Sequence, residues 1–186
     1  INLTIPSIQQ QFGIGAETVQ WLQTLYVLFF GGFLIIGGKL SDQLGRKNIF
    51  LLGLFLFMLT SLGAGLSESF GTLAIFRALQ GLGAAFIMPS AMSIVTNTFK
   101  EDQERNRAIG IFSSFAAIGS GSGLSLGGII STYLSWHWVF LINVPILFIT
   151  LIFAYQYLPK DEKGMSQKPD LLSGILLVLG LLSLTY

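Results

Sequence analysis

The chain has 186 residues, of which 52% are hydrophobic and only 10% are charged. Soluble domains carry about a quarter charged residues, so this composition excludes an ordinary soluble domain, and no basic stripe for a nucleic-acid partner is present. The chain contains no cysteine and a single histidine, His137, which excludes disulfides, thiolate metal sites and a multi-histidine metal site.

Long apolar stretches follow one another along the chain and predict an all-α protein that crosses a membrane several times. A helical span needs roughly 20 apolar residues, and these stretches lack the period-two alternation of a β-barrel. The predicted spans are residues 1–8 (incomplete), 18–37, 48–66, 72–96, 108–134 and 139–158. The polar segments between them are 9–17, 38–47, 67–71, 97–107 and 135–138.

The apolar runs at the two ends, 1–8 and 171–186, are too short to cross a bilayer. We therefore expect a fragment that lacks part of its first helix and everything after the start of its seventh. The predicted organisation is an N-terminal transmembrane bundle over 1–158, a cytoplasmic linker over 159–170 and the start of helix seven over 171–186.

Basic residues are confined to one side of the predicted membrane. Nine of the ten Lys and Arg residues lie in the polar segments that follow the even-numbered spans. The positive-inside rule then makes 38–47, 97–107 and 159–170 cytoplasmic loops of a multi-pass protein in the cell (inner or plasma) membrane. The tenth basic residue, Arg77, lies inside the fourth span.

The polar segment 38–47 has a distinctive order of residues. Gly38 and Gly45 bracket Asp42, and Arg46 and Lys47 follow at once. We expect the glycines to let the chain reverse tightly and Asp42 to lie near a helix N-terminus, where exposed amides bind carboxylates. The two cations are expected to pair with Asp42 or with the acidic residues of 97–107.

Arg77 is the charge that most needs an explanation. An arginine at a span centre costs roughly 2.5–3.5 kcal/mol and usually faces a cavity or a partner. Gln80 lies one turn further in on the same side, and the alternative is an arginine that snorkels or contacts a carbonyl. None of the nine acidic residues falls inside a predicted span, so a carboxylate partner would have to lie outside this chain.

Small residues recur at helical spacing on two spans. Gly119, Gly123 and Gly127 repeat every four residues on the fifth span, and Gly81 and Ala85 do so on the fourth. This spacing predicts close approach between helices.

Other side chains are candidates for the membrane interface or for a cavity. The tryptophans at the outer ends of the spans predict an interfacial aromatic belt; these are Trp21, Trp136 and Trp138. The candidates for lining a substrate cavity are Asn2, Gln23, Tyr26 and Asn143. The alternative for each of these four is a hydrogen bond between helices.

Several of these segments resemble signatures of one family. The segment 38–47 resembles the motif between helices two and three of the major facilitator superfamily, and 77–81 (Arg-Ala-Leu-Gln-Gly) is similar to its R-x-x-Q-G pattern. Residues 119–128 resemble the antiporter signature of helix five. Residues 1–6 and 135–145 resemble stretches of the fourteen-helix, EmrB/QacA-type drug:proton antiporters.

The resemblance implies a fold and a function. The fold would be the N-terminal six-helix bundle of two inverted three-helix repeats, completed by a C-terminal half. The function would be proton-driven export of lipophilic or cationic small molecules across the bilayer, with the proton gradient as energy source and no cofactor. The implied conformational switch comprises Gly38, Asp42, Gly45, Arg46 and Lys47. The implied proton-coupling residues are Arg77, Gln80 and Gly81. The helix-five signature comprises Gly119, Gly123, Gly127 and Gly128.

Departures from the family pattern keep alternatives open. Leu124 replaces the proline of the antiporter signature, so symport or uniport of a nutrient or metabolite remains an alternative function. A membrane scaffold or sensor is a more remote alternative. His137 stands where the subgroup has arginine. A serine hydrolase built from Ser120, Ser122 and His137 fails, because His137 lies in an outer turn and no G-x-S-G element is present.

Overall fold

The structure, a computed structural model, describes residues 4–158, and these form helices without any strand. Five segments are long and apolar enough to cross a membrane, with α6 and α7 together forming one of them. This confirms the predicted all-α membrane fold. The helices are α1 (Ile5–Phe12), α2 (Ala16–Leu44), α3 (Arg46–Gly65), α4 (Phe70–Thr98), α5 (Asp102–Tyr133), α6 (Trp136–Leu141) and α7 (Asn143–Tyr157).

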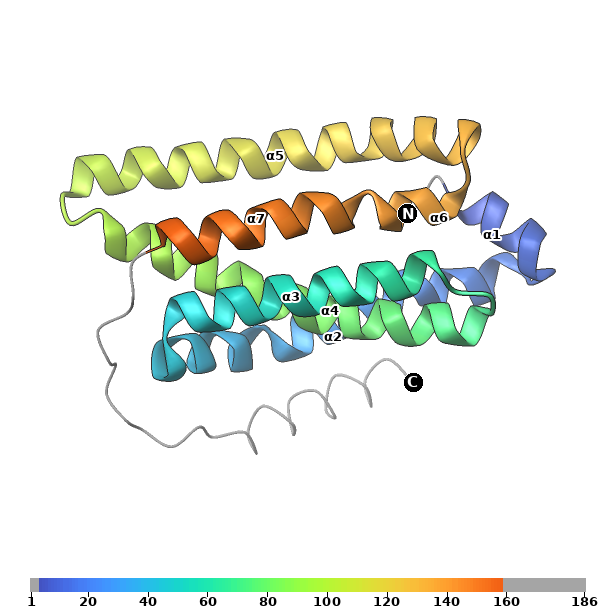
Figure 1. Cartoon of the computed structure of the whole chain (residues 1–186), viewed down its shortest axis with the longest axis horizontal. Coiled ribbons are helices and arrows are strands. Elements are labelled where there is room, and N and C mark those ends of the chain that lie inside the picture. Colours follow the sequence, from blue (N-terminus) through green and yellow to red (C-terminus); the bar gives the residue numbers. More distant parts are fainter. Residues whose placement is uncertain (1–3, 159–186) are drawn as a thin grey trace.

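The long helices lie side by side along a common direction (Figure 1). Helix α4 packs against both α2 and α3, and α3 also contacts α6 and α7. Helix α5 contacts α4 and α6 and lies on the opposite side of the bundle from α2 (Figure 1). The α2–α3 and α4–α5 junctions lie at the same end of the bundle, on the left in Figure 1.

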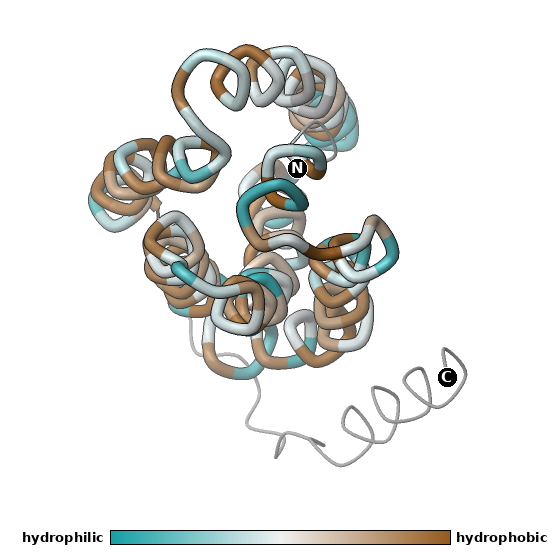
Figure 2. The backbone as a smooth tube through the Cα atoms, turned by 90° about the vertical axis from the view of Figure 1, so that its right-hand side faces the viewer, coloured by the Kyte–Doolittle hydropathy of each residue, from teal (hydrophilic) through white to brown (hydrophobic). Residues whose placement is uncertain are grey.

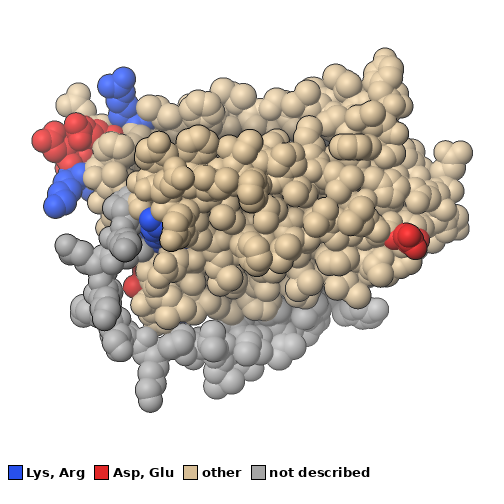
Figure 3. Space-filling view, viewed as in Figure 1, with Lys and Arg blue, Asp and Glu red and all other residues tan. Residues whose placement is uncertain are grey.

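The surface is apolar along the helices and charged at their ends. In Figure 2, which looks along the bundle, hydrophobic positions face outward as well as inward. Large apolar side chains such as Phe115, Ile118 and Phe153 are exposed. Lys and Arg side chains gather at one end of the bundle (Figure 3). Between residues 4 and 158, every Lys and Arg except Arg77 lies near the α2–α3 or the α4–α5 junction.

The two inner polar segments are mostly helical, so their prediction as loops was wrong. Helix α2 continues to Leu44 and α3 begins at Arg46, with Gly45 alone between them at φ 96°, a conformation that favours glycine. Gly38 lies inside α2 and makes no turn. Helix α5 begins already at Asp102, since acidic side chains in a first turn stabilise a helix N-terminus.

The first helix extends further than the sequence predicted. It runs through Phe12 rather than ending near Ile8, and Gly13, at φ 63°, closes it by donating its amide to the Gln9 carbonyl oxygen. The predicted outer loop 9–17 shrinks to the few residues between α1 and α2.

This extension decides the surroundings of one tryptophan. Trp136 is 2% exposed, its Nε1 donates to Gln11 Oε1 at 2.6 Å, and its ring lies 5.9 Å from that of Phe12. The aromatic-belt prediction is therefore wrong for Trp136, because α1 covers it. Trp21 and Trp138 are 41% and 50% exposed, as that belt requires.

The sixth span is broken into two helices. It begins at Trp136, earlier than predicted, and the break falls at Ile142 between α6 and α7. Pro145 lies in the first turn of α7, where its missing N–H leaves the carbonyl of Leu141 without a helical donor. The side-chain Nδ2 of Asn143 donates across the break to the Val139 carbonyl oxygen at 3.2 Å.

Candidate functional site

A buried cation lies where α4 meets α2. The side chain of Arg77 is 8% exposed. Its Nε donates to the Leu22 carbonyl oxygen at 3.2 Å, and its Nη1 donates to Gln80 Oε1 at 2.5 Å. Its Cζ lies 4.3 Å from the ring centroid of Tyr26, within range of a cation–π interaction. Arg77 is thus held by hydrogen bonds and an aromatic face inside the bundle and does not snorkel to its end.

The contacts of Arg77 extend to two further helices. Gln80 donates from Nε2 to Ser61 Oγ on α3 at 2.6 Å, and both residues are almost completely buried. The ring centroid of Phe140 on α6 lies 5.9 Å from Arg77 Cζ. We call Arg77, Gln80, Ser61, Tyr26 and Phe140 the Arg77 cluster. The prediction that Gln80 lies on the same side of α4 as Arg77 is confirmed.

Glycine at position 81 permits this cluster to form. A Cβ at Gly81 would lie 2.3 Å from the Tyr26 carbonyl oxygen, so α2 and α4 are in backbone contact there. Gly37 makes a second such contact, since a Cβ there would lie 2.2 Å from the carbonyl oxygen of Ala85. The predicted close approach through Gly81 and Ala85 is confirmed, and it brings Leu22 and Tyr26 within reach of Arg77.

Arg77 lacks an anionic partner among residues 4–158. The ion pair recorded in this range joins Arg105 and Asp102 on the first turn of α5. The guanidinium has more N–H donors than its two hydrogen bonds use. A buried cation without a counter-ion is costly, so within these residues the guanidinium is stabilised by the Leu22 carbonyl oxygen, the Gln80 amide oxygen and the ring of Tyr26.

The residues of the segment 38–47 lie at the charged end of the bundle. Asp42 is exposed in the last turn of α2, not at a helix N-terminus as predicted, and Arg46 is the first residue of α3. Lys47 donates to the carbonyl oxygens of Tyr155 and Leu158 at 2.8 and 2.6 Å. It thus caps the C-terminal end of α7, where cations are favoured, a partner that the sequence did not indicate.

The glycines of the fifth helix do not make the predicted close contact with the other described helices. A Cβ at Gly119, Gly123 or Gly127 would meet nothing within 4 Å. Gly119 and Gly123 are exposed, and Gly127 and Gly128 are half-buried. This face of α5 is therefore open within residues 4–158.

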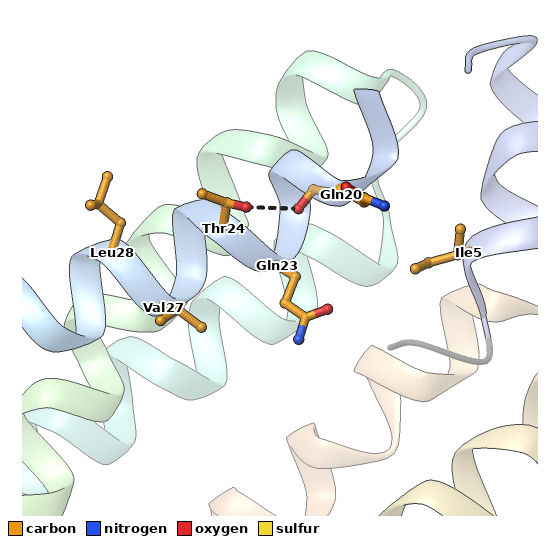
Figure 4. A pocket seen from close by; sticks show the side chains of 6 residues that line it. All are labelled: Ile5, Gln20, Gln23, Thr24, Val27 and Leu28. Atoms are coloured by element: carbon orange, nitrogen blue, oxygen red, sulfur yellow. Dashed lines mark hydrogen bonds between the residues drawn. The ribbon is translucent and has the colours of Figure 1, made fainter. Parts of the chain in front are cut away.

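One pocket of about 530 Å³ lies between α1 and α2 (Figure 4). Gln23 lines this pocket, and its place in a substrate cavity stays a prediction; the ring of Tyr26 lies against Arg77. The side chain of Asn143 donates to the Val139 carbonyl oxygen on α6, and Asn2 lies outside the described residues. The full lining comprises Ile5, Gln20, Gln23, Thr24, Val27 and Leu28.

Comparison with known proteins identifies the family. The family model described as Major Facilitator Superfamily matches residues 1–184. The chain belongs to the major facilitator superfamily. This superfamily chain is 36% identical over its whole length to the puromycin resistance protein of Streptomyces alboniger, and 38% identical to the cephamycin export protein of Amycolatopsis lactamdurans. It spans only 37% and 38% of the length of these two relatives.

A third relative and a solved structure complete the comparison. The superfamily chain is 33% identical to the riboflavin transporter of Clostridioides difficile, over 95% of this chain and 39% of that protein. A crystal structure of the peptide transporter POT in complex with sulfate matches 94% of the chain, and the chain covers 37% of that structure, with a TM-score of 0.73 and 20% identity. At that identity the structural match supports the superfamily fold alone.

Proposed function

We propose that this chain forms the N-terminal half of a secondary transporter that exports lipophilic or cationic small molecules in exchange for protons. The observation that carries the proposal is the Arg77 cluster, a buried cation with unused donors and no carboxylate partner among residues 4–158. The relatives named for puromycin resistance and cephamycin export support the efflux direction.

The proposed coupling places Arg77 beside a carboxylate that these residues do not supply. A nearby guanidinium favours the ionised form of a carboxylate. When substrate arrives or a helix moves, the distance between the two groups changes and the carboxylate binds or releases a proton. Gln80 and Gly81 act in this scheme by holding Arg77 and by letting α2 approach. The proton gradient supplies the energy, and no cofactor is needed.

The charged end of the bundle is proposed to be cytoplasmic, in the cell membrane. Its basic residues follow the positive-inside pattern. Asp42 is exposed there, on the last turn of α2, and is available to a partner on the C-terminal half of the transporter. We assign Asp42, together with Gly45 and Arg46, to the switch between inward-open and outward-open states.

A second candidate is symport or uniport of a nutrient or metabolite. Leu124 in place of the antiporter proline favours it. So does the similarity to a riboflavin transporter.

The test uses the full-length protein in inverted membrane vesicles that hold a proton gradient, with internal pH followed by a fluorescent dye. Proton release on adding a lipophilic cation, abolished by a protonophore, is expected for antiport. Substrate uptake without a pH response, unaffected by the protonophore, would favour uniport, and proton movement in the same direction as substrate would favour symport.

A further inference from the structure

The side chain of Gln80 is hydrogen-bonded to two neighbours, Arg77 and Ser61. An arginine only donates hydrogen bonds, so the oxygen of the Gln80 amide must face Arg77. The amide nitrogen, which only donates, must then find an acceptor on the other side. At 1% exposure, Gln80 has no access to bulk solvent.

Ser61 supplies that acceptor. Its Oγ lies 2.6 Å from Gln80 Nε2, and its side chain is fully buried on α3. The amide oxygen meanwhile accepts from Arg77 Nη1, 2.5 Å away, so the two hydrogen bonds hold the Gln80 side chain from both sides. The chain of contacts therefore runs from α3 through Gln80 to the guanidinium.

We propose that Ser61 is a positioning residue for proton coupling, which accepts from the Gln80 amide nitrogen, holds that side chain against Arg77 and through it keeps Arg77 in place. The inference rests on the proposed function. Without the Ser61 hydroxyl, the buried amide nitrogen loses its partner, and an unsatisfied buried donor is strongly disfavoured. Gln80 then turns toward another acceptor and gives up its bond to Arg77.

The decisive variant is Ser61→Ala, and the chain offers a matched control in Thr60→Val. Thr60 is the preceding residue, is 3% exposed, and donates to the carbonyl oxygen of Leu56 in its own helix at 2.8 Å. Both substitutions remove a buried hydroxyl from the same turn of α3, but the hydroxyl bonded to Gln80 is that of Ser61. Ser61→Thr keeps the hydroxyl and is the expected rescue.

The first measurement is thermal unfolding of the purified full-length protein, which does not depend on transport. Ser61→Ala is expected to lower the apparent Tm in the native background and to have no further effect in the Gln80→Ala background. Thr60→Val is expected to have the same effect in both. An equal loss for Ser61→Ala in both backgrounds would show that it does not act through Gln80 and would overturn the inference.

The second measurement is the pH profile of substrate-driven proton release in vesicles. Ser61→Ala is expected to move the midpoint of this profile by about 0.5 to 1 pH unit toward higher pH, because a less well placed cation stabilises the ionised carboxylate less. Thr60→Val and Ser61→Thr are expected to keep the native midpoint. A lower rate of proton release with an unchanged midpoint would show that Ser61 contributes only to packing and would overturn the inference. If the native protein releases no protons, the proposed function fails, and the unfolding measurement alone decides whether Ser61 holds Gln80 in place.

Discussion

Replacing Gly81 by alanine tests whether backbone contact between α2 and α4 holds the Arg77 cluster together. The added Cβ would lie 2.3 Å from the Tyr26 carbonyl oxygen and 3.1 Å from the Phe30 nitrogen. These neighbours are backbone atoms, so no side-chain rotation relieves the clash.

The size of the effect follows from these distances. An ordinary contact begins near 3.4 Å, so α2 and α4 must separate locally by about 1 Å. The bond from Arg77 Nε to the Leu22 carbonyl oxygen, now 3.2 Å, would then exceed hydrogen-bonding length. Overpacking of this kind costs about 1–3 kcal/mol, against a gain of up to about 1 kcal/mol from replacing glycine in a helix.

Gly81→Ala is therefore expected to lower the apparent Tm of the purified full-length protein. About 1 kcal/mol shifts a unit of 150–250 residues by roughly 2–4 °C, and a longer protein by less. The matched control is Gly31→Ala on α2, where an added Cβ meets nothing within 4 Å. This control should be neutral or stabilising. Equal Tm values for the two variants would refute the contact argument.

Three further substitutions probe other contacts. Trp136→Phe keeps a ring but removes the donor to Gln11 Oε1, and should cost about 1 kcal/mol, measured by thermal unfolding; an unchanged Tm would show that this bond contributes nothing. Lys47→Met removes the cation that caps α7 and should speed amide hydrogen exchange in the last turn of that helix. Exchange at the native rate would contradict this prediction. Asp42→Asn should slow transport while membrane insertion is kept, unlike the control Glu68→Gln at the outer end; normal transport by Asp42→Asn would remove it from the switch.

The sequence predicted the spans well because a segment that crosses the bilayer core must be apolar over its whole length. It predicted helix ends poorly for the same reason, since a helix can continue into water on charged residues. Helix α5 begins at Asp102, inside a segment expected to be a loop, because Asp102 and Glu104 stabilise its first turn.

Tertiary contacts account for the other differences. Arg77 and Gln80 could be paired from helical spacing alone, but Ser61 is a serine in an apolar run with no local signal of its partner on another helix. The sequence predicts Trp136 at the membrane interface, because nothing in its own segment shows that α1 packs over it. The glycines of α5 have the spacing of a packing face, and spacing does not say which helix would meet it.

The central claim is that Arg77 couples proton movement to transport. The most direct measurement compares the native full-length protein with Arg77→Ala and Arg77→Lys in inverted vesicles, following internal pH on adding a lipophilic cation. The control is Gly31→Ala on α2, where an added Cβ meets nothing within 4 Å. The account predicts proton release in the native and control proteins, none with alanine, and partial release with lysine, which keeps the charge but not the paired geometry. Native proton release by the alanine variant would contradict it.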